Sequence, residues 1–430
     1  MNRRSKSRKL PEADQELPRW PESVVGGKYV RLLERQLQAL RQEESAHGNR
    51  ALFLDDVFIA YLLAFFNPTI RSLRTIEDFS QTRQAQKHLS ITKVCRSTLS
   101  DFNRLADPAR LQPVLQALRQ QLSRQTAGAR SDDLSRLLQQ TIAVDGTFLP
   151  AMAEVAWATR RSKSEASAWQ ARLDMHVAVE TWLPELIVVP EPQQSESSSA
   201  AAHVQDGHIY LYDRGYSGFE VINAHYQLRH EQWESRAHFL IRYKPAGGNA
   251  PELKEAQSLP LTNADSAAGV VSDRVGKFLS SKPSRHPVHE VTLREVLVEY
   301  HDAGELKTLR IITNLMEVPA AVIAQLYRHR WQIELFFRWL KCFGNFRHLI
   351  SHTREGVLLH LYVAVVAALL MYLHTGYRPS KYLFVMLSQV ASGGATWDEI
   401  MPILRERERQ RDLERQAAAK RRAKKKSQAR

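Results

Sequence analysis

Hydrophobic residues in the first part of the chain recur every three or four positions, which is the spacing of amphipathic helices. The run ALFLDDVFIAYLLAFFNP, residues 51–68, follows this pattern, and Ser72–Leu122 continues it. Within the second stretch, SITKVCRSTLSDFNRL (Ser90–Leu105) predicts either a helix-turn-helix element, with Ser97 or Ser100 as N-cap, or ordinary helices of a bundle. The first part of the chain is therefore predicted to be helical.

Beyond TAGARSDD, residues 126–133, whose Gly and Asp content is typical of a linker, the pattern changes to that of strands. Short runs rich in Val and Ile are separated by polar segments, as expected for a sheet. The four runs are QTIAVDGTFL, RLDMHVAVET, LPELIVVPEP and HIYLYDRGY. The segment QQSESSSAAAHVQDG before the fourth run is compatible with a Ser-rich loop or a small helix, and the pattern leaves both open.

A fifth apolar run, HFLIRYK (His238–Lys244), predicts another strand, and a polar region containing GGNAPE follows it. Val288–Leu315 then has the pattern of a β-hairpin with its turn at Asp302–Glu305. A single helix is predicted after the hairpin, from about Pro319 to Lys341. Strands, an added β segment and a helix in this order are typical of an α/β core with an insertion.

The most apolar run of the chain, VLLHLYVAVVAALLMYL (Val357–Leu373), contains His360 and is shorter than the about 20 residues that span a bilayer. We interpret it as a buried core helix, and we expect no membrane association. The first residues are basic but lack the apolar run of a signal peptide. Two cysteines in 430 residues argue against a disulfide scaffold and a multi-cysteine zinc site, and they fit the reducing cytoplasm.

The net charge of +14 suggests a polyanionic partner, but the charge is concentrated at the two ends of the chain. Residues 1–9 contain five Lys or Arg and no acid, and residues 405–430 contain twelve Lys or Arg against four acids. The body between them is nearly neutral, so it could bind nucleic acid only through charges placed in a pattern. The basic ends are either nucleic-acid-binding tails or solvated extensions.

The stretch YRHRWQIELFFRWLK, which starts at Tyr327, places charged residues among aromatic ones within the predicted helix. At about 100° per residue, Arg330, Glu334 and Lys341 lie at about 300°, 340° and 320° from Tyr327, in one narrow stripe. Apolar residues flank this stripe on both sides, which does not favour a solvent-facing role. The alternatives are a buried ion-pair network and a site in which a carboxylate holds a metal ion and cations hold an anionic ligand.

Two further carboxylates interrupt the predicted strands. Asp145 lies within TIAVDGTF, and Asp213 lies at the end of the apolar run in IYLYDRGY, two residues before Gly215. Each alone is explained as well by a turn or a strand-end cap. Together with Glu334 they make three acids in apolar surroundings, and carboxylate oxygens are the ligands of hard cations such as Mg²⁺. The three acids therefore point to a magnesium site.

The spacing of Tyr327, two residues, Arg330, three residues, Glu334, six residues and Lys341 resembles the YREK signature of bacterial insertion-sequence transposases of the DDE type. The upstream DGT and DRGY occur in the order of that family, and TNL and HFLIRYK look like its corresponding segments. The resemblance covers about residues 134–373, more loosely the helical part before them, and not the basic ends.

The resemblance implies an α/β fold, with a ribonuclease-H-like mixed sheet, flanking helices, a β-rich insertion and a helical N-terminal domain. The expected divisions are a basic tail and linker at 1–45 and a helical DNA-binding domain at 46–130. A catalytic domain at 131–375 would contain the insertion, at about 236–305, and a helical C-terminal segment with a basic tail would occupy 376–430.

The resemblance also implies the chemistry. Asp145, Asp213 and Glu334 would be the catalytic acids and would hold two Mg²⁺ ions, with Mn²⁺ tolerated. Arg330 and Lys341 would bind phosphates beside the scissile bond, Arg330 through its planar fork and Lys341 as a point charge.

Five more residues are candidates for contact with DNA. Tyr327 would add a hydroxyl contact to a phosphate, or would simply pack. Arg214 and Tyr216 in DRGY are weaker candidates. Arg242 and Lys244 share one face of their predicted strand, which suits a DNA backbone and equally a solvated face.

The resulting hypothesis is a cut-and-paste transposase in the cytoplasm, associated with the nucleoid. It would act as a homodimer, cleave double-stranded DNA at terminal inverted repeats and transfer the 3′-hydroxyl into target DNA. Two alternatives stay open, a domesticated DNA-binding protein without catalysis and a metal-dependent nuclease without strand transfer.

Overall fold

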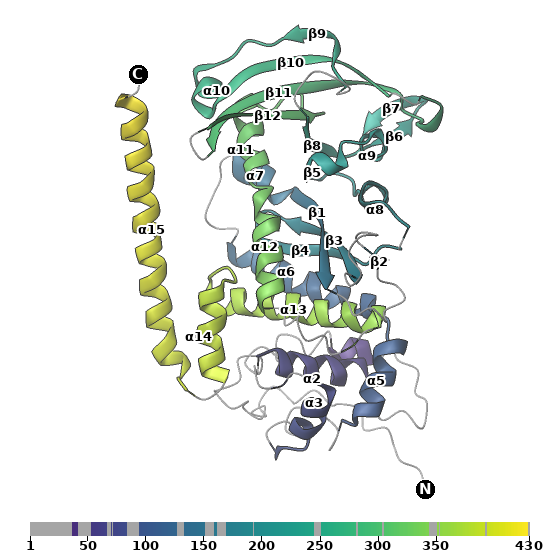
Figure 1. The fold of residues 1–430 in the computed structure, drawn as a ribbon, viewed down its shortest axis with the longest axis vertical. Coiled ribbons are helices and arrows are strands. Elements are labelled where there is room, and N and C mark those ends of the chain that lie inside the picture. Colours follow the sequence, from purple (N-terminus) through teal and green to yellow (C-terminus); the bar gives the residue numbers. More distant parts are fainter. Residues whose placement is uncertain are drawn as a thin grey trace. The chain divides into compact units, whose positions relative to one another are not determined.

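The computed structural model of the chain divides into two compact units, residues 1–118 with 342–430, and residues 119–341 (Figure 1). The structure describes residues 37–41, 53–66, 70, 72–83, 94–126, 133–150, 159–160, 169–191, 193–244, 251–280, 283–302, 305–343, 351, 353–391 and 394–428.

The first unit is built of helices around one long apolar helix. This helix, α13, is the one helix of the described residues that is long and apolar enough to cross a membrane, and 89% of its most apolar window is buried within the structure. It packs against α2, α5 and η1, as a core helix does, in agreement with its interpretation from the sequence. The elements are α2 (Leu54–Phe66), α3 (Leu73–Ser80), α5 (Arg96–Leu105), η1 (Pro108–Leu111), α6 (Gln112–Thr126, which runs into the second unit), α13 (Arg354–Thr375), α14 (Lys381–Ala391) and α15 (Trp397–Gln428).

The N-cap predicted for the possible helix-turn-helix element is wrong. Ser97 and Ser100 lie inside α5, which begins at Arg96 with Cys95 as its N-cap. Cys95 has extended backbone angles, and its carbonyl accepts the first helical hydrogen bond, from the Leu99 amide, at 3.0 Å. Residues 90–93 of the predicted element lie outside the described residues, so the helix-turn-helix itself stays a prediction.

The second unit is built on one mixed sheet of ten strands. Its order is β2-β3-β1-β5-β8-β12-β11-β10-β9, with β4 also paired to β3. The strands are β1 (Thr141–Pro150), β2 (Thr159–Arg160), β3 (Trp169–Ala178), β4 (Leu183–Val188), β5 (Ile209–Tyr212), β8 (His238–Tyr243), β9 (Lys254–Ser258), β10 (Val270–Leu279), β11 (Glu290–Asp302) and β12 (Glu305–Thr313), and a separate hairpin contains β6 (Tyr226–Arg229) and β7 (Gln232–Ser235).

The first half of this sheet has the ribonuclease-H-like order. β1, β3 and β4 form an antiparallel meander, and β5 and β8 then add in parallel on the other side of β1. All five strands were predicted from their apolar runs. The predicted α/β fold class is therefore confirmed.

The second half of the sheet continues from β8 through β12, β11, β10 and β9 in antiparallel pairs, and β8 to β11 fall within the β-rich insertion predicted at about 236–305. The predicted hairpin is present, with Asp302 opposite Glu305 at its turn. Strand β10, which the sequence pattern did not reveal, carries Asp273 in its interior. Asp273 can be buried because Arg294 of β11 forms an ion pair with it at 2.6 Å. A local sequence pattern does not show a partner that lies on another strand.

Short helices connect the strands. The Ser-rich segment before β5, which the pattern left open, forms the small helix α8, and the Ser195 hydroxyl caps it by accepting from the Ser198 amide at 3.0 Å. The helical elements of this unit are α7 (Asp133–Gln139), α8 (Glu196–Ala202), η2 (Arg214–Tyr216), α9 (Phe219–Asn223), α10 (Asn263–Ala268), η3 (Pro283–Arg285), α11 (Ala320–Arg328) and α12 (Trp331–Phe343, which ends in the first unit).

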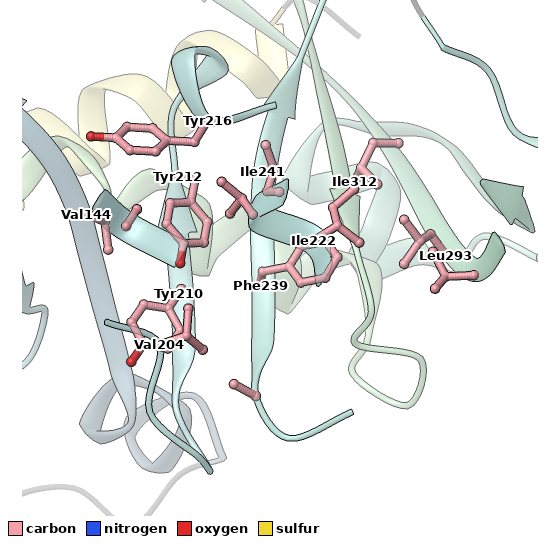
Figure 2. Packing of buried hydrophobic residues seen from close by; sticks show 14 of the residues in the cluster. Val144, Val204, Tyr210, Tyr212, Tyr216, Ile222, Phe239, Ile241, Leu293 and Ile312 are labelled. Carbon is pink, nitrogen blue, oxygen red and sulfur yellow. The ribbon is translucent and has the colours of Figure 1, made fainter. Parts of the chain in front are cut away.

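A hydrophobic cluster fixes α8 and α9 to the sheet (Figure 2). Ile142 and Val144 of β1 and Tyr210 and Tyr212 of β5 belong to it, together with side chains from β8 and both helices. Because side chains alternate along a strand, the odd-numbered residues of β1 and β5 face the opposite side of the sheet. That second face is buried as well, since Ala143, Leu173 and Leu211 on it are 0% exposed.

The single helix predicted from Pro319 to Lys341 is wrong, because two helices, α11 and α12, occupy this stretch. At their junction the Arg330 amide donates to the Tyr327 carbonyl three residues back, at 3.0 Å, instead of four residues back. This tighter turn breaks the regular 100° step on which the predicted stripe depends. Trp331 and Leu335 are also 51% and 38% exposed, so apolar packing does not enclose the stripe on both sides.

Candidate active site

Asp145 and Asp213 are brought together by the register of two neighbouring parallel strands. Val144 of β1 is paired with Tyr212 of β5, and each acid is the next residue of its chain. Because the two acids occupy equivalent positions after this pair, their side chains leave the two strands in the same direction. The first two predicted acids therefore lie side by side on the same face of the sheet.

The surroundings of Asp145 work against its negative charge. The Gly146 amide donates to Asp145 Oδ1 at 2.9 Å, and Arg330 also favours the charged form. Burial is the stronger effect, and the charges of Asp213 and Glu196 act in the same direction, so the pKa of Asp145 rises to about 7. A bound cation would favour the charged form of this carboxyl and so lower its pKa.

Asp213 has one oxygen that lacks a hydrogen-bond partner. Its side chain is 39% exposed as a whole, but its Oδ1 atom is buried and accepts no hydrogen bond from the described residues. The nearest cation is Arg242, which follows the paired Tyr212–Ile241 position on β8 and places Nη1 at 3.9 Å from Oδ1. Arg242 therefore lies beside the two acids, and its guanidinium is itself 39% exposed.

Glu334 lies in the first turn of α12 and is held by Arg330. Arg330 Nη2 donates to Glu334 Oε1 at 2.5 Å. The arginine side chain is 9% exposed and the glutamate 31%, so the pair is anchored at its cationic end. Burial lowers the pKa of Arg330, but Tyr327, Glu334 and Asp213 together outweigh it and raise that pKa, which keeps the guanidinium charged.

Tyr327 connects α11 to the strand that carries Asp213. Its hydroxyl donates to the Tyr212 carbonyl at 3.1 Å, and its ring is buried. Burial also raises the pKa of the hydroxyl, so it remains a donor at neutral pH. Tyr212 directly precedes Asp213, so this bond ties the Tyr327–Arg330 segment to the end of β5.

The remaining residues predicted to contact DNA differ in their exposure to solvent. Arg214 and Lys244 are exposed close to the acids in sequence, at the ends of β5 and β8. Tyr216 is 1% exposed, so its hydroxyl lies inside the protein. Lys341 lies in the last part of α12, and its side chain is outside the described residues.

Trp182 is a residue of this region that the sequence did not reveal. Its indole N–H donates to the Gln332 carbonyl at 2.7 Å, and its ring meets Phe336 edge-on, with centroids 5.8 Å apart. Both partners belong to α12 and flank Glu334. Trp182 occupies the turn between β3 and β4 with φ of 64°, a left-handed conformation that a bulky side chain rarely adopts. The sheet therefore holds the start of α12 through one strained tryptophan.

The insertion holds the start of α11. Asp265 Oδ1 accepts from the Ala321 amide at 2.7 Å, and Arg328 Nη2 donates to the Ala268 carbonyl at 2.9 Å. Asp265 and Ala268 both belong to α10, within the insertion. The insertion thus contacts both ends of α11, and the bond from Tyr327 to the Tyr212 carbonyl also holds its last turn.

The three acids have the chemistry of a divalent cation site. Carboxylate oxygens are the preferred ligands of Mg²⁺, and the buried, unpartnered Oδ1 of Asp213 is an oxygen that such an ion would satisfy. Across the described residues, three His, Cys, Asp or Glu side chains do not converge into a ready-made metal-binding group. Asp145 and Asp213 can offer their carboxylate oxygens to such an ion, whereas Glu334 is hydrogen-bonded to Arg330.

Known proteins resemble the chain across this region. Residues 136–370 match the family model described as the transposase DDE domain. A putative transposase from Sinorhizobium fredii is 25% identical over 231 residues, which is 53% of this chain and 59% of the relative. A probable transposase for insertion sequence element IS5377 from Geobacillus stearothermophilus is 36% identical over 80 residues, 19% of this chain and 21% of the relative. The matches thus span less than two thirds of the length of these relatives.

Among solved structures, the synaptic complex of piggyBac transposase with hairpin DNA aligns with 90% of this chain and 80% of its own, at 9% identity. Its TM-score of 0.38 is too low to define a shared fold, so the strand order alone supports the ribonuclease-H-like assignment. The family model, by contrast, covers more than half of the chain and includes Asp145, Asp213 and Glu334. The protein therefore belongs to the DDE transposases, a family of enzymes.

Proposed function

We propose that the protein is a cut-and-paste DNA transposase, which cleaves DNA at the ends of its element and joins the freed 3′-hydroxyl to target DNA. One observation carries the proposal. Asp145 and Asp213 lie side by side, each directly after the last paired residue of two parallel strands. Phosphodiester transfer requires such a fixed pair of carboxylates beside the reacting phosphate.

Membership of the family implies a divalent metal ion, and we propose Mg²⁺, with Mn²⁺ tolerated and two ions per site. Asp145, Asp213 and Glu334 would hold them. When bound, the ions supply activation of the attacking oxygen and stabilisation of the leaving oxygen. The buried Oδ1 of Asp213 and the elevated pKa of Asp145 both support cation binding at the strand ends.

The basic residues around the acids suit the phosphates of a DNA strand. Arg330 is charged, planar and adjacent to Glu334, so it can orient a phosphate through two parallel hydrogen bonds. Arg242 is half-exposed beside Asp213, and Arg214 and Lys244 are exposed nearby. Lys341 is included on its sequence spacing alone, which completes the YREK pattern.

Tyr327 is better suited to positioning than to contact with DNA. Its buried hydroxyl is already bonded to the Tyr212 carbonyl, the residue before Asp213. Tyr216 is fully buried and is likewise not part of the proposed DNA surface. In this proposal both tyrosines help to position the neighbouring acids and do not contact DNA.

The partners follow from the proposed reaction. They are double-stranded DNA with terminal inverted repeats and a target DNA, bound by a homodimer that pairs two element ends. The proposed location is the cytoplasm, at the nucleoid. The basic stretches at residues 1–9 and 405–430 would add non-specific affinity for DNA.

The test is an incubation of the full chain with Mg²⁺ and DNA taken from both flanks of its reading frame, with nicked and joined products scored separately. Transposition predicts nicks at defined positions and covalently joined products. Nicks without joining would indicate a nuclease, and binding without either product would indicate a DNA-binding protein that has lost catalysis. Asp145→Asn and Asp213→Asn serve as controls, because each should remove both products.

A further inference from the structure

Glu196, the first residue of α8, reaches the same strand ends as Asp145 and Asp213. A Cβ atom on Gly146 would lie 3.1 Å from Glu196 Oε1, and one on Gly215 would lie 3.9 Å from Oε2. Gly146 directly follows Asp145, and Gly215 is two residues beyond Asp213. The carboxylate of Glu196 therefore lies against Gly146 within β1 and near Gly215 after β5, where the missing side chains of DGT and DRGY leave room for it.

The position of α8 is fixed, so this placement is not that of a free surface side chain. Ser197 donates its hydroxyl to the Gly215 carbonyl at 3.4 Å, and Ala200 of the same helix is buried in the hydrophobic cluster. Glu196 is half-buried, and its carboxylate forms no hydrogen bond or ion pair with the residues that the structure describes. Burial, followed by the charge of Asp174, raises the pKa of Glu196, and Arg172 offsets this only in part.

The neighbouring Asp174 differs from Glu196 because it has an ion-pair partner. Arg172 donates to both of its oxygens, from Nε at 3.0 Å and from Nη2 at 3.1 Å. Asp174 is 3% exposed and also approaches Gly146, with Oδ1 at 3.1 Å from a Cβ there. Its charge is thus neutralised by a forked ion pair, which leaves Glu196 as the available carboxylate on this side.

A second observation points to a ligand at the same place. Tyr216 is 1% exposed, and its hydroxyl is buried without a hydrogen-bond partner among the described residues. Its ring lies at the edge of the hydrophobic cluster, and the hydroxyl points away from the rest of the cluster (Figure 2). The charges that act on this hydroxyl are led by Asp145, Glu196 and Asp174. A buried hydroxyl without a hydrogen-bond partner, close to several carboxylates, indicates a site for a polar or ionic ligand.

We propose that Glu196 is a fourth carboxylate of the metal centre, which binds the divalent cation together with Asp145. The Tyr216 hydroxyl, which has no hydrogen-bond partner among the described residues of the metal-free protein, would donate to one of these carboxylates when the ion is bound. This inference rests on the proposed metal-dependent function and adds to it a ligand from α8. The order of contributions along the chain is then β1, α8, the end of β5 and α12.

The test is Mn²⁺ binding to the metal-free full chain without DNA, measured by calorimetric titration and by the electron paramagnetic resonance signal of free Mn²⁺. Glu196→Gln keeps the shape of the side chain and removes its charge. We expect it to weaken Mn²⁺ binding about 10- to 100-fold, the range found when groups around a metal site are removed. Tyr216→Phe should weaken it less, by about threefold to tenfold, because it removes one hydrogen bond and leaves all ligands in place.

Glu220→Gln is the matched control, because Glu220 lies in the first turn of the adjacent short helix α9 and is exposed. It should bind Mn²⁺ like the unaltered protein. Equal affinity of Glu196→Gln and Glu220→Gln would overturn the proposal and leave Glu196 a structural residue. Glu196→Asp keeps the charge on a shorter side chain, so its Mn²⁺ affinity should lie between those of Glu196→Gln and Glu220→Gln. This variant tests the proposal if Glu196→Gln does not fold.

Asp145→Asn separates this inference from the proposed function. If Asp145→Asn loses Mn²⁺ binding while Glu196→Gln retains it, the metal centre stands without Glu196. If the unaltered protein and Asp145→Asn bind Mn²⁺ equally weakly, the metal-dependent function itself fails, and the role of Glu196 fails with it.

Discussion

The acids of the candidate site are held in place by two different means. Asp145 and Asp213 are placed by the backbone, because the parallel register of β1 and β5 fixes where each of them emerges. Glu334 is placed by side chains, since Arg330 donates a hydrogen bond to its carboxylate and Trp182 donates one to the Gln332 carbonyl at the start of its helix. The sheet pair is therefore preorganised, whereas the helix acid depends on contacts that can be exchanged.

This difference also appears in the charges. Burial opposes the charge of Asp145 in the metal-free protein, and Asp213 and Glu196 add to that effect, so that Arg330 offsets it only in part. Glu334 has the opposite situation, because a buried guanidinium compensates it. Removing one or the other charge should thus have the same effect on catalysis and opposite effects on stability, which gives the comparison a direct test.

The largest effect is expected on catalysis. Glu334→Gln removes a proposed metal ligand with almost no change of shape, and we expect DNA cleavage to fall by about 10³-fold or more, the order of loss seen when central groups of an active site are removed. Binding to element-end DNA should persist. The measurement is the single-turnover cleavage rate, with a gel-shift assay as the control for binding. Cleavage at the unaltered rate would remove Glu334 from the site.

Stability should separate the two acids. Glu334→Gln leaves the buried Arg330 with a neutral partner and should lower the free energy of unfolding by about 1–3 kcal/mol. Asp145→Asn removes a charge that its surroundings oppose, so at pH 8 without metal it should raise that free energy by about 1 kcal/mol or more. Urea unfolding of both variants in chelator checks the signs. Destabilisation by both would mean that Asp145 is compensated after all.

The pH dependence of stability should follow from the raised pKa of Asp145. Between about pH 4 and pH 7 the folded protein keeps a proton on this carboxyl that the unfolded chain has released, so stability falls as the pH rises. The slope is at most about 1.4 kcal/mol per pH unit for one group. Unfolding in chelator at pH 5, 6 and 7 should show a shallower slope for Asp145→Asn. An identical slope in both proteins would assign the titration to other groups.

The sequence located the strands that carry Asp145 and Asp213 because their signal is local. An apolar strand interrupted by one acid is visible in TIAVDGTF and in IYLYDRGY, and the five core strands formed where their apolar runs stand. The shared register could not be predicted from either run alone, because it depends on how β1 and β5 pair. Family resemblance supplied the link between the two acids that the local pattern lacked.

The helix region was predicted less well for a physical reason. Periodicity assumes one continuous helix, but the hydrogen bond from Arg330 to Tyr327 tightens the turn between α11 and α12. Glu196 gave even less signal, since ESSSAAA reads as an ordinary helix start and its neighbours Gly146 and Gly215 are distant in sequence. The local pattern of one sequence does not show contacts between segments that are distant along the chain.

A moderate effect is expected where the sheet holds the helix acid. Trp182→Phe keeps a ring against Phe336 but removes the indole N–H that bonds the Gln332 carbonyl. We expect the cleavage rate at saturating DNA to fall about tenfold, because the net value of one such hydrogen bond is about 1 kcal/mol. Trp331→Phe, on the exposed side of the same helix, is the control and should change the rate little. Equal rates for both variants would show that α12 is held by other contacts.

The smallest effect is expected at the edge of the sheet pair, where Arg242 stands 3.9 Å from Asp213 and remains 39% exposed. If it binds a phosphate, Arg242→Ala should weaken end-DNA binding a few-fold and lower the slope of log affinity against log salt by about one contact, roughly 0.9. Arg136→Ala is a matched control, since Arg136 of α7 lies outside the predicted DNA-binding domain, is 72% exposed and pairs with Asp133 at 3.5 Å. Because Asp213 keeps its place through the backbone, Mn²⁺ binding by Arg242→Ala should not weaken. A loss of Mn²⁺ affinity together with an unchanged salt slope would instead make Arg242 the side-chain support of Asp213, and the sheet acids would then resemble Glu334 in how they are held.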